Sequence, residues 1–328
     1  MTDGSALNQA LKLHSESIIL DAHCDTLTAM PDQGRSLAGP SERGQLDLPR
    51  LQAGGVNIQF FAAFIDPRFK FTAAHRALEI IDLFYRETEE NKNFMLPVKS
   101  VLDMEQALSS GKIAAFLAIE GGEALEGSLG ILRLMHKLGV RSITLTWNGR
   151  NELGDGVGEE QTGGGLTQFG QSAVLEMNGL GMLVDVSHLS EKGFWDVINI
   201  SRQPVIASHS NCQALCGHPR NLTDRQIKAL SNQGGVMGIT FVPDFLGDRR
   251  NGVTDVINHI EHALAIGGPD CVGIGSDFDG TEELPPGLGD CSRLPLITSA
   301  LLERGHSEEV IKKVLGGNFI RVIKQVIK

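Results

Sequence analysis

The stretch IILDAHCD at residues 18–25 is an apolar run that ends in two side chains able to bind a metal, His23 and Asp25. Similar runs recur along the chain, and each ends in a residue of the same kind. These are IAAFLAIEGG at 113–122 with Glu120, MLVDVSH at 182–188 with His188, VIASHS at 205–210 with His209, and CVGIGSD at 271–277 with Asp277. Short apolar runs predict buried strands of a parallel sheet. Polar residues at their carboxyl ends are typical of a (β/α)8 barrel, whose chemistry lies at that face.

Apolar runs alternate with amphipathic stretches along the whole chain, which predicts βα units. The expected strands span residues 17–25, 56–65, 113–120, 142–147, 182–188, 204–209, 235–242 and 271–277. The expected helices span 72–92, 101–110, 128–138, 168–180, 190–200, 223–233, 253–266, 294–304 and 307–327, with N-caps at Ser190, Thr223 and Ser307. We expect a single α/β domain over residues 1–328, folded as one TIM barrel. A doubly wound sheet is the alternative, but DAHCDTLTAM lacks the glycine loop that typically follows its first strand.

Two segments, 26–54 and 148–167, are expected to be long loops at the functional face of the barrel. The net charge of −11 argues against a nucleic-acid partner, which would require a basic surface. The sequence shows no secretory signal and no run long enough to span a membrane. Five cysteines in 328 residues fit reduced thiols better than a disulfide framework, so we expect a cytoplasmic protein.

The ligand types suit two divalent ions. His23 and Asp25 are one residue apart on an expected strand, so both side chains would project from one face and could bind zinc or manganese. Glu120 has two carboxylate oxygens, which can bridge ions about 3.5 to 4 Å apart. His188 and His209 would complete the second ion's ligands and leave a position open for water. Taken singly, each histidine also fits a hydrogen-bonded core residue, and Glu120 a helix cap or loop residue.

Two further residues suit the handling of a substrate. Asp277 could accept a proton from the attacking water and pass it to a leaving amine, whereas Asp279 is expected to be structural. Arg220, in HPRN at 218–221, could bind a carboxylate through two parallel hydrogen bonds, although a surface arginine is the ordinary alternative. A compact structural zinc site is a further alternative, with the ligands His209, Cys212, Cys216 and His218.

These motifs resemble the membrane dipeptidase family of metallopeptidases, whose best-known member is renal dipeptidase. The resemblance runs through LDAHCDTL, AIEGGEAL, SITLTWN, LVDVSHLS, PVIASHS, HPRNLTD and VGIGSDFDG, in that order. It implies an amidohydrolase-type barrel with two divalent ions, expected to be zinc. By motif position, the ion ligands would be His23, Asp25, Glu120, His188 and His209. Arg220 would anchor the substrate carboxylate and Asp277 would handle the proton.

One position departs from the family pattern. Animal members carry a substrate-binding histidine after the LT of the fourth-strand motif, and here Trp147 stands in that place. The missing histidine is expected to polarise the scissile carbonyl, so its loss bears on rate and substrate range. Trp147 and Asn148 are therefore candidate substrate contacts, and Asn148 or Asn151 could replace the histidine by hydrogen bonding. The extracellular members are also lipid-anchored and disulfide-bonded, so a prokaryotic-type cytoplasmic relative is expected.

We therefore expect a metal-dependent dipeptidase, in which two metal ions activate a hydroxide that attacks the peptide bond. The family also tolerates a D-residue at the C-terminal position of the substrate. Another barrel hydrolase, such as a lactonase or amidase, is the first alternative; many of these carry His-x-His on the first strand and a bridging lysine, which SITLTW lacks. A catalytically weak metal-binding homologue is the second. The expected partner is a dipeptide, with neither nucleic acid nor membrane, and the acidic barrel could form a homodimer.

Overall fold

The computed structural model describes residues 3–247 and 252–328, and in these ranges it contains nine strands that pair in parallel. The strands are β1 (Ile19–Asp21), β2 (Val56–Phe64), β3 (Met95–Val98), β4 (Ile113–Glu120), β5 (Val140–Thr144), β6 (Leu183–Asp185), β7 (Ile206–Ser210), β8 (Val236–Ile239) and β9 (Val272–Ile274). Eight of them close into a barrel, because β1 pairs with both β2 and β9 while β2 pairs with β4. The predicted (β/α)8 barrel is confirmed.

The remaining strand, β3, shares one edge of β4 with β5. Met95 to Val98 pair with Ile113 to Phe116, and β5 pairs with the second half of β4, from Leu117 to Glu120. The sequence interpretation missed β3 because it is only four residues long and contains Pro97, and proline is confined to the edges of sheets. The strand extends the barrel at this edge without taking part in its closure.

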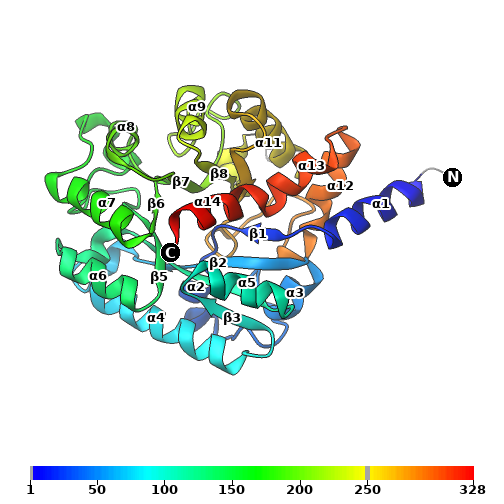
Figure 1. Cartoon of the computed structure of the whole chain (residues 1–328), viewed down its shortest axis with the longest axis horizontal. Helices are drawn as coiled ribbons and strands as arrows, with labels where there is room; N and C mark the ends of the chain where they lie inside the picture. The colour runs from blue at the N-terminus through cyan, green and yellow to red at the C-terminus, as the bar shows by residue number, and fades with distance from the viewer. Residues whose placement is uncertain (1–2, 248–251) are drawn as a thin grey trace.

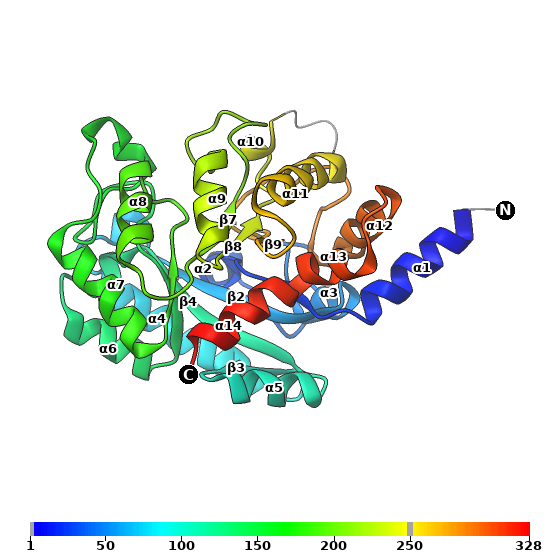
Figure 2. The same ribbon diagram turned by 45° about the horizontal axis from the view of Figure 1, so that its top comes forward.

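Helices surround the barrel (Figure 1). Those that follow or precede its strands are α4 (Ala73–Glu90), α5 (Val101–Ser109), α6 (Leu129–Lys137), α7 (Gln168–Leu180), α8 (Glu191–Ile200), α9 (Asp224–Asn232), α10 (Pro243–Leu246), α11 (Val253–Gly267), α12 (Pro295–Glu303), α13 (Glu308–Lys312) and α14 (Asn318–Val326). Figure 2 shows α8, α9 and α11 on one side of the barrel and α4, α5 and α6 on the other. The predicted caps Ser190, Thr223 and Ser307 each accept a hydrogen bond from the first turn of their helix and are confirmed.

The expected loop over residues 26–54 was wrong in part, because it contains α2 (Thr26–Gln33) and α3 (Leu48–Ala53). Pro31 lies inside α2, and a proline in a helix interior makes the segment resemble a loop in sequence. The segment 148–167 is a loop with one short 3₁₀ helix, Val157–Thr162, and isolated β-bridges. A helix that the sequence did not predict, α1 (Asp3–Ser15), extends from the barrel toward the N-terminus in both views.

The last predicted helix, 307–327, is interrupted. A five-residue π-helical stretch, Lys313–Gly317, separates α13 from α14. The backbone of Gly316 lies so close to the carbonyl oxygen of Ile18 that a Cβ atom would collide with it. This glycine therefore lets the C-terminal helix pack directly against the chain that enters β1. In the described ranges, no helix is both long and apolar enough to cross a membrane.

Candidate metal centre and active site

The side chains singled out from the sequence come together at the carboxyl end of the barrel. Glu120 is the last residue of β4, and His209 lies within β7. The others lie in the turns that directly follow their strands: His23 after β1, His188 after β6 and Asp277 after β9. All are at most 8% exposed. The barrel thus gathers residues from five strand ends into one buried cluster.

Three of the strands that lead to the site end earlier than predicted, and the difference changes how the site is built. β1, β6 and β9 end at Asp21, Asp185 and Ile274, before the residues that form the site. The argument that His23 and Asp25 project from one face of a strand is therefore wrong, since Asp25 is the residue that precedes the first turn of α2. The turn nevertheless brings Nε2 of His23 within 3.7 Å of Oδ2 of Asp25.

The backbone at two of these turns is strained. His188 and Asp277 each have a φ of 66°, in the left-handed region that residues other than glycine rarely adopt. Asp279 has a φ of 67° and Glu126 a φ of 46°, so three of the four such residues belong to the site or follow it directly. Strain of this kind costs on the order of 1–3 kcal/mol per residue and persists where the surrounding structure fixes it.

One half of the cluster consists of His188, His209 and one oxygen of Glu120. Nε2 of His188 lies 2.9 Å from Oε1 of Glu120, and Nε2 of His209 lies 3.4 Å from the same oxygen. The two Nε2 atoms are 2.9 Å apart. Each ring directs its other nitrogen elsewhere: Nδ1 of His188 lies 2.8 Å from Oδ1 of Asn148, and Nδ1 of His209 lies 2.8 Å from Oγ of Ser208. When two ring nitrogens face each other at this distance, a cation bound by both of them would stabilise the arrangement.

The other half surrounds His23. Its Nε2 lies 3.4 Å from Oε2 of Glu120, 3.7 Å from Oδ2 of Asp25 and 3.8 Å from Oδ1 of Asp277. Nε2 of His23 and Oδ1 of Asp25 are buried without a hydrogen-bond partner. Two overlapping groups of potential ligands result, His23 with Glu120 and His209, and His23 with Asp25 and Asp277. Unpartnered buried donor and acceptor atoms within such groups fit divalent metal ions.

The pKa shifts follow from burial and the close charges. Burial lowers the pKa of His188 to about 4 and that of His209 well below its usual value, so both rings are neutral, as metal ligands must be. Burial also opposes charge on His23, but Glu120 and Asp25 outweigh it and raise its pKa well above the usual value. Burial raises the pKa of Asp277 to about 7, with Asp25 and Glu120 adding to the shift and His23 and Arg220 opposing it.

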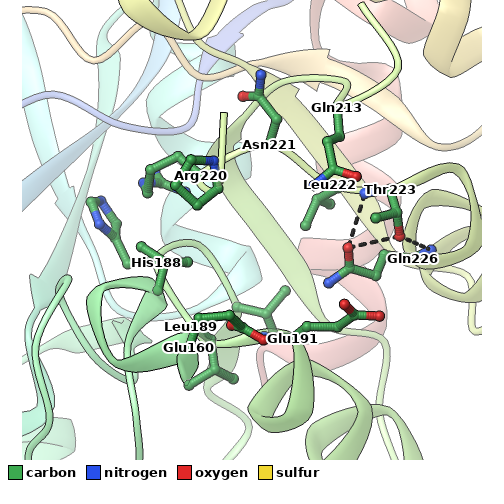
Figure 3. Close-up of a pocket in the computed structure, with 13 residues that line it drawn as sticks. Glu160, His188, Leu189, Glu191, Gln213, Arg220, Asn221, Leu222, Thr223 and Gln226 are labelled. Atoms are coloured by element: carbon green, nitrogen blue, oxygen red, sulfur yellow. Dashed lines mark hydrogen bonds between the residues drawn. The ribbon is translucent and has the colours of Figure 1, made fainter. Parts of the chain in front are cut away.

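Arg220 follows β7 in the loop to α9 and is buried, with 4% of its surface exposed. Its Nη2 donates to the carbonyl oxygen of His209 at 2.9 Å and its Nη1 to Oγ of Ser210 at 3.5 Å, while its Nε has no hydrogen-bond partner. A cavity of about 110 Å³ lies beside it, and Figure 3 shows His188 and Arg220 on one side of this cavity with Thr223 and Gln226 on the other. The guanidinium therefore lies next to the histidine half of the cluster with donor capacity to spare.

Asp279 holds the loop regions together. Its carboxylate accepts hydrogen bonds from Oγ1 of Thr26 at 2.6 Å, from Nη2 of Arg35 at 2.7 Å and from the backbone N–H of Gln45 at 2.6 Å. These contacts tie the turn after β9 to the segment that contains α2. These hydrogen bonds agree with the structural role expected for Asp279.

The candidate substrate contacts differ in their positions and in their hydrogen-bond partners. The ring of Trp147 lies 5.4 Å from that of Phe64 and 6.0 Å from that of His188, so it forms a half-buried wall beside the cluster. Asn148 is occupied by its contact with His188. Asn151 donates to the carbonyl oxygen of Leu145 and accepts from two backbone N–H groups of its own loop, so its amide shapes the loop.

The alternative structural zinc site does not assemble. Cys212 donates to the carbonyl oxygen of His259, and Cys216 to that of Asp244. The ring of His218 stacks on Phe245 at 4.5 Å, while His209 faces Glu120. Among the described residues, neither group of potential metal ligands contains a cysteine.

Sequence reasoning missed two buried aspartates, Asp21 and Asp185, each of which is the last residue of its strand. Asp21 accepts from the backbone N–H and the hydroxyl of Ser276, at 2.8 and 2.6 Å. Asp185 accepts in the same way from Ser208, at 2.9 and 2.5 Å. Burial raises the pKa of Asp21, although its hydrogen bonds oppose the shift. An aspartate within an apolar run, as in ILDAH and LVDVSH, was the signal that could have found them.

Comparison with known proteins identifies the family of this chain. The model of the membrane dipeptidase family, peptidase family M19, matches residues 7–328. The chain belongs to this family. It is 36% identical over 296 residues to dipeptidase aclJ of Aspergillus oryzae. The aligned region covers 86% of this chain and 70% of that protein.

Solved structures of the family agree. The crystal structure of dipeptidase AC, a metallopeptidase of family M19, superposes with a TM-score of 0.89 at 30% identity, over 95% of this chain and 99% of that one. A metallopeptidase from Rhodobacter sphaeroides, bound to a phosphinate mimic of L-Ala-D-Ala, superposes with a TM-score of 0.87 at 29% identity, over 94% and 99% of the two chains. The protein is thus an M19 metallo-dipeptidase, a hydrolase that acts on peptide bonds and uses a divalent metal.

Proposed function

We propose that the protein hydrolyses dipeptides that carry a free C-terminal carboxylate, with two zinc ions held by the cluster. The position of Glu120 is the observation that carries this proposal. Its Oε1 faces His188 and His209, whereas its Oε2 faces His23. A carboxylate whose two oxygens face separate ligand groups is suited to bridge two ions. His23 and Asp25 would complete one site, and His188 and His209 the other.

When bound, the two ions supply a water of lowered pKa and polarise the scissile carbonyl. The chain's own residues do the rest. Arg220 binds the substrate carboxylate through the donors that its contacts with His209 and Ser210 leave free. Asp277, within 3.8 Å of His23, takes up a proton from the attacking water and passes it to the leaving amine. Asn148 accepts from Nδ1 of His188 and keeps that ring's Nε2 directed at the cluster.

Trp147 shapes the substrate range. Its ring lies beside His188, at the position where relatives are expected to carry a carbonyl-binding histidine. The indole ring therefore gives the substrate an apolar surface where that histidine would bind the carbonyl. Substrates with a D-residue at the C-terminus belong to the proposal because the Rhodobacter sphaeroides relative binds a mimic of L-Ala-D-Ala. A cytoplasmic location and a homodimer stay predictions from the sequence.

The test combines metal analysis with a substrate panel. The purified protein is expected to contain about two zinc ions per chain and to cleave L,L dipeptides, L,D dipeptides or both. In Glu120→Gln, which keeps the size of the side chain, metal content and turnover should both fall while the fold is retained. The control is Glu126→Gln, which changes a carboxylate in the segment that follows β4, outside the cluster, and should leave both unchanged. A wild-type protein that neither binds metal nor cleaves any dipeptide, or a Glu120→Gln variant with full turnover, would refute the proposal.

A further inference from the structure

A hydrogen-bonded chain of buried side chains runs from the end of β6 to the ring of His209. At its origin, Asp185 is 1% exposed and accepts four hydrogen bonds. Its Oδ1 accepts from the backbone N–H groups of Ser187 and Ser208, at 3.0 and 2.9 Å. Its Oδ2 accepts from the hydroxyls of Thr144 and Ser208, at 2.6 and 2.5 Å. Four donors converge on this carboxylate, so it acts only as an acceptor.

The acceptor role of Asp185 fixes the direction of the next bond. Since the hydroxyl hydrogen of Ser208 goes to Asp185, the Ser208 oxygen offers only a lone pair to Nδ1 of His209, 2.8 Å away. The ring must therefore carry its hydrogen on Nδ1. Nε2, which lies 3.4 Å from Glu120 and 2.9 Å from Nε2 of His188, is then left as a lone pair directed into the cluster.

We propose that Asp185 and Ser208 are positioning residues that set the tautomer of His209 and so prepare its Nε2 to bind metal. The inference rests on the proposed two-metal function and adds to it two residues that touch neither substrate nor ion. Partners behind a ligating histidine typically change metal affinity by about 10- to 100-fold.

The fold contains a second pair of the same kind that does not end on a histidine ring. Asp21 accepts from the backbone and hydroxyl of Ser276, and also from Nε2 of Gln59 at 3.0 Å. It contacts His23 only through that residue's backbone N–H, at 3.4 Å, and not through its ring. The other partners of the Ser276 hydroxyl are backbone atoms, the carbonyl oxygen of His23 and the N–H of Phe278. Both aspartates and both serines are at most 2% exposed. The Asp21 pair is thus an internal control for the loss of a buried Asp–Ser contact.

The replacement Asp185→Asn tests the direction of the chain without removing its atoms. The amide oxygen can still accept from the N–H groups of Ser187 and Ser208, and the NH₂ group takes the place of Oδ2. That NH₂ group donates to the Ser208 oxygen, so the hydroxyl hydrogen turns toward Nδ1 of His209. The ring hydrogen then resides on Nε2, which can no longer bind an ion. An Asp→Asn change behind a catalytic histidine acts in this way in serine proteases, where it selects the wrong tautomer.

The experiment measures zinc affinity by competition with a chromophoric chelator and the protonated ring nitrogen of His209 by ¹⁵N NMR of the metal-free, full-length protein. His209 is expected to be Nδ1-protonated in the wild type and Nε2-protonated in Asp185→Asn, with zinc binding weakened by about 10- to 100-fold. The control Asp21→Asn should leave the His209 tautomer unchanged and weaken zinc binding less than Asp185→Asn does. Ser208→Ala, compared with Ser276→Ala, repeats the test if Asp185→Asn does not fold.

Each outcome decides the matter. An unchanged tautomer in Asp185→Asn, or equal losses of zinc affinity in the paired variants, would overturn the positioning role and leave the two-metal function standing. A wild-type protein without zinc affinity would overturn both. Chemical unfolding of the four variants provides the remaining readout, because a merely structural role predicts that zinc affinity follows the loss of stability in both pairs alike.

Discussion

Arg220→Met is the sharpest test of how the substrate is held, because methionine keeps much of the side chain's length and removes its charge. The guanidinium is buried, uses Nη2 on the carbonyl oxygen of His209 and leaves Nε unpartnered. A substrate carboxylate bound by two charge-assisted hydrogen bonds would gain about 1.5–3 kcal/mol from each. The loss is then about 3–6 kcal/mol, which corresponds to a fall of about 10²- to 10⁴-fold in kcat/KM.

The assay compares a free dipeptide with its C-terminal amide. The wild type should prefer the free acid, and Arg220→Met should lose that preference through a higher KM while changing little for the amide. Arg220→Lys keeps the charge without the planar fork and should lie between them. The control is Arg225→Met, since Arg225 is exposed and stacks on Trp195 at 5.6 Å. Equal losses for both substrates would refute the carboxylate role.

The variant should also fold. Burial lowers the pKa of Arg220 to about 10, although Asp277 and Glu120 oppose the shift, so folding disfavours its charged form. Removing the charge is therefore expected to leave the free energy of unfolding unchanged or to raise it, as measured with urea. A loss of activity that accompanied unfolding would instead mark Arg220 as a structural residue.

Two predictions concern stability away from the cluster. Arg35→Met leaves the buried carboxylate of Asp279 without its cation and should cost about 3–5 kcal/mol in urea unfolding; a loss below about 1 kcal/mol would contradict the ion pair. His14 bonds to Thr298 and to the carbonyl oxygen of Gly54, and burial lowers its pKa below the usual 6.5. Its protonation therefore favours the unfolded state below about pH 6.5, so the wild type should lose more stability than His14→Gln between pH 7.5 and 5. Parallel losses in both proteins would exclude His14 as a source of acid sensitivity.

The barrel was predictable because its strands are continuous apolar runs. In β4 every residue from Ile113 to Glu120 is buried, so no alternation confuses the pattern. Elements whose stability depends on their neighbours were not predictable. β3 is held by pairing to β4, and α2 forms despite Pro31. Local sequence preference contradicts the structure in both, and tertiary packing decides.

The candidate site was predictable in composition but not in geometry. The rule that polar strand ends meet at one face brings Glu120 and His209 together without any knowledge of side-chain directions. The sequence could not indicate that β6 ends three residues before His188, nor that Ser208 donates hydrogen bonds to Asp185. Such pairings depend on the register between neighbouring strands, which is set by the closed barrel as a whole.

The two strand-ending aspartates explain why the strands stop where they do. Asp185 accepts from the N–H of Ser187, the residue directly before the strained His188. Asp21 accepts from the N–H of Ser276, the residue directly before the strained Asp277. Each carboxylate thus takes a backbone donor that an extended strand would have given to its neighbour, and so stabilises the turn. The same hydrogen bonds that end the strands offset the strained backbone that directs His188 and Asp277 into the cluster, so fold and site share one set of contacts.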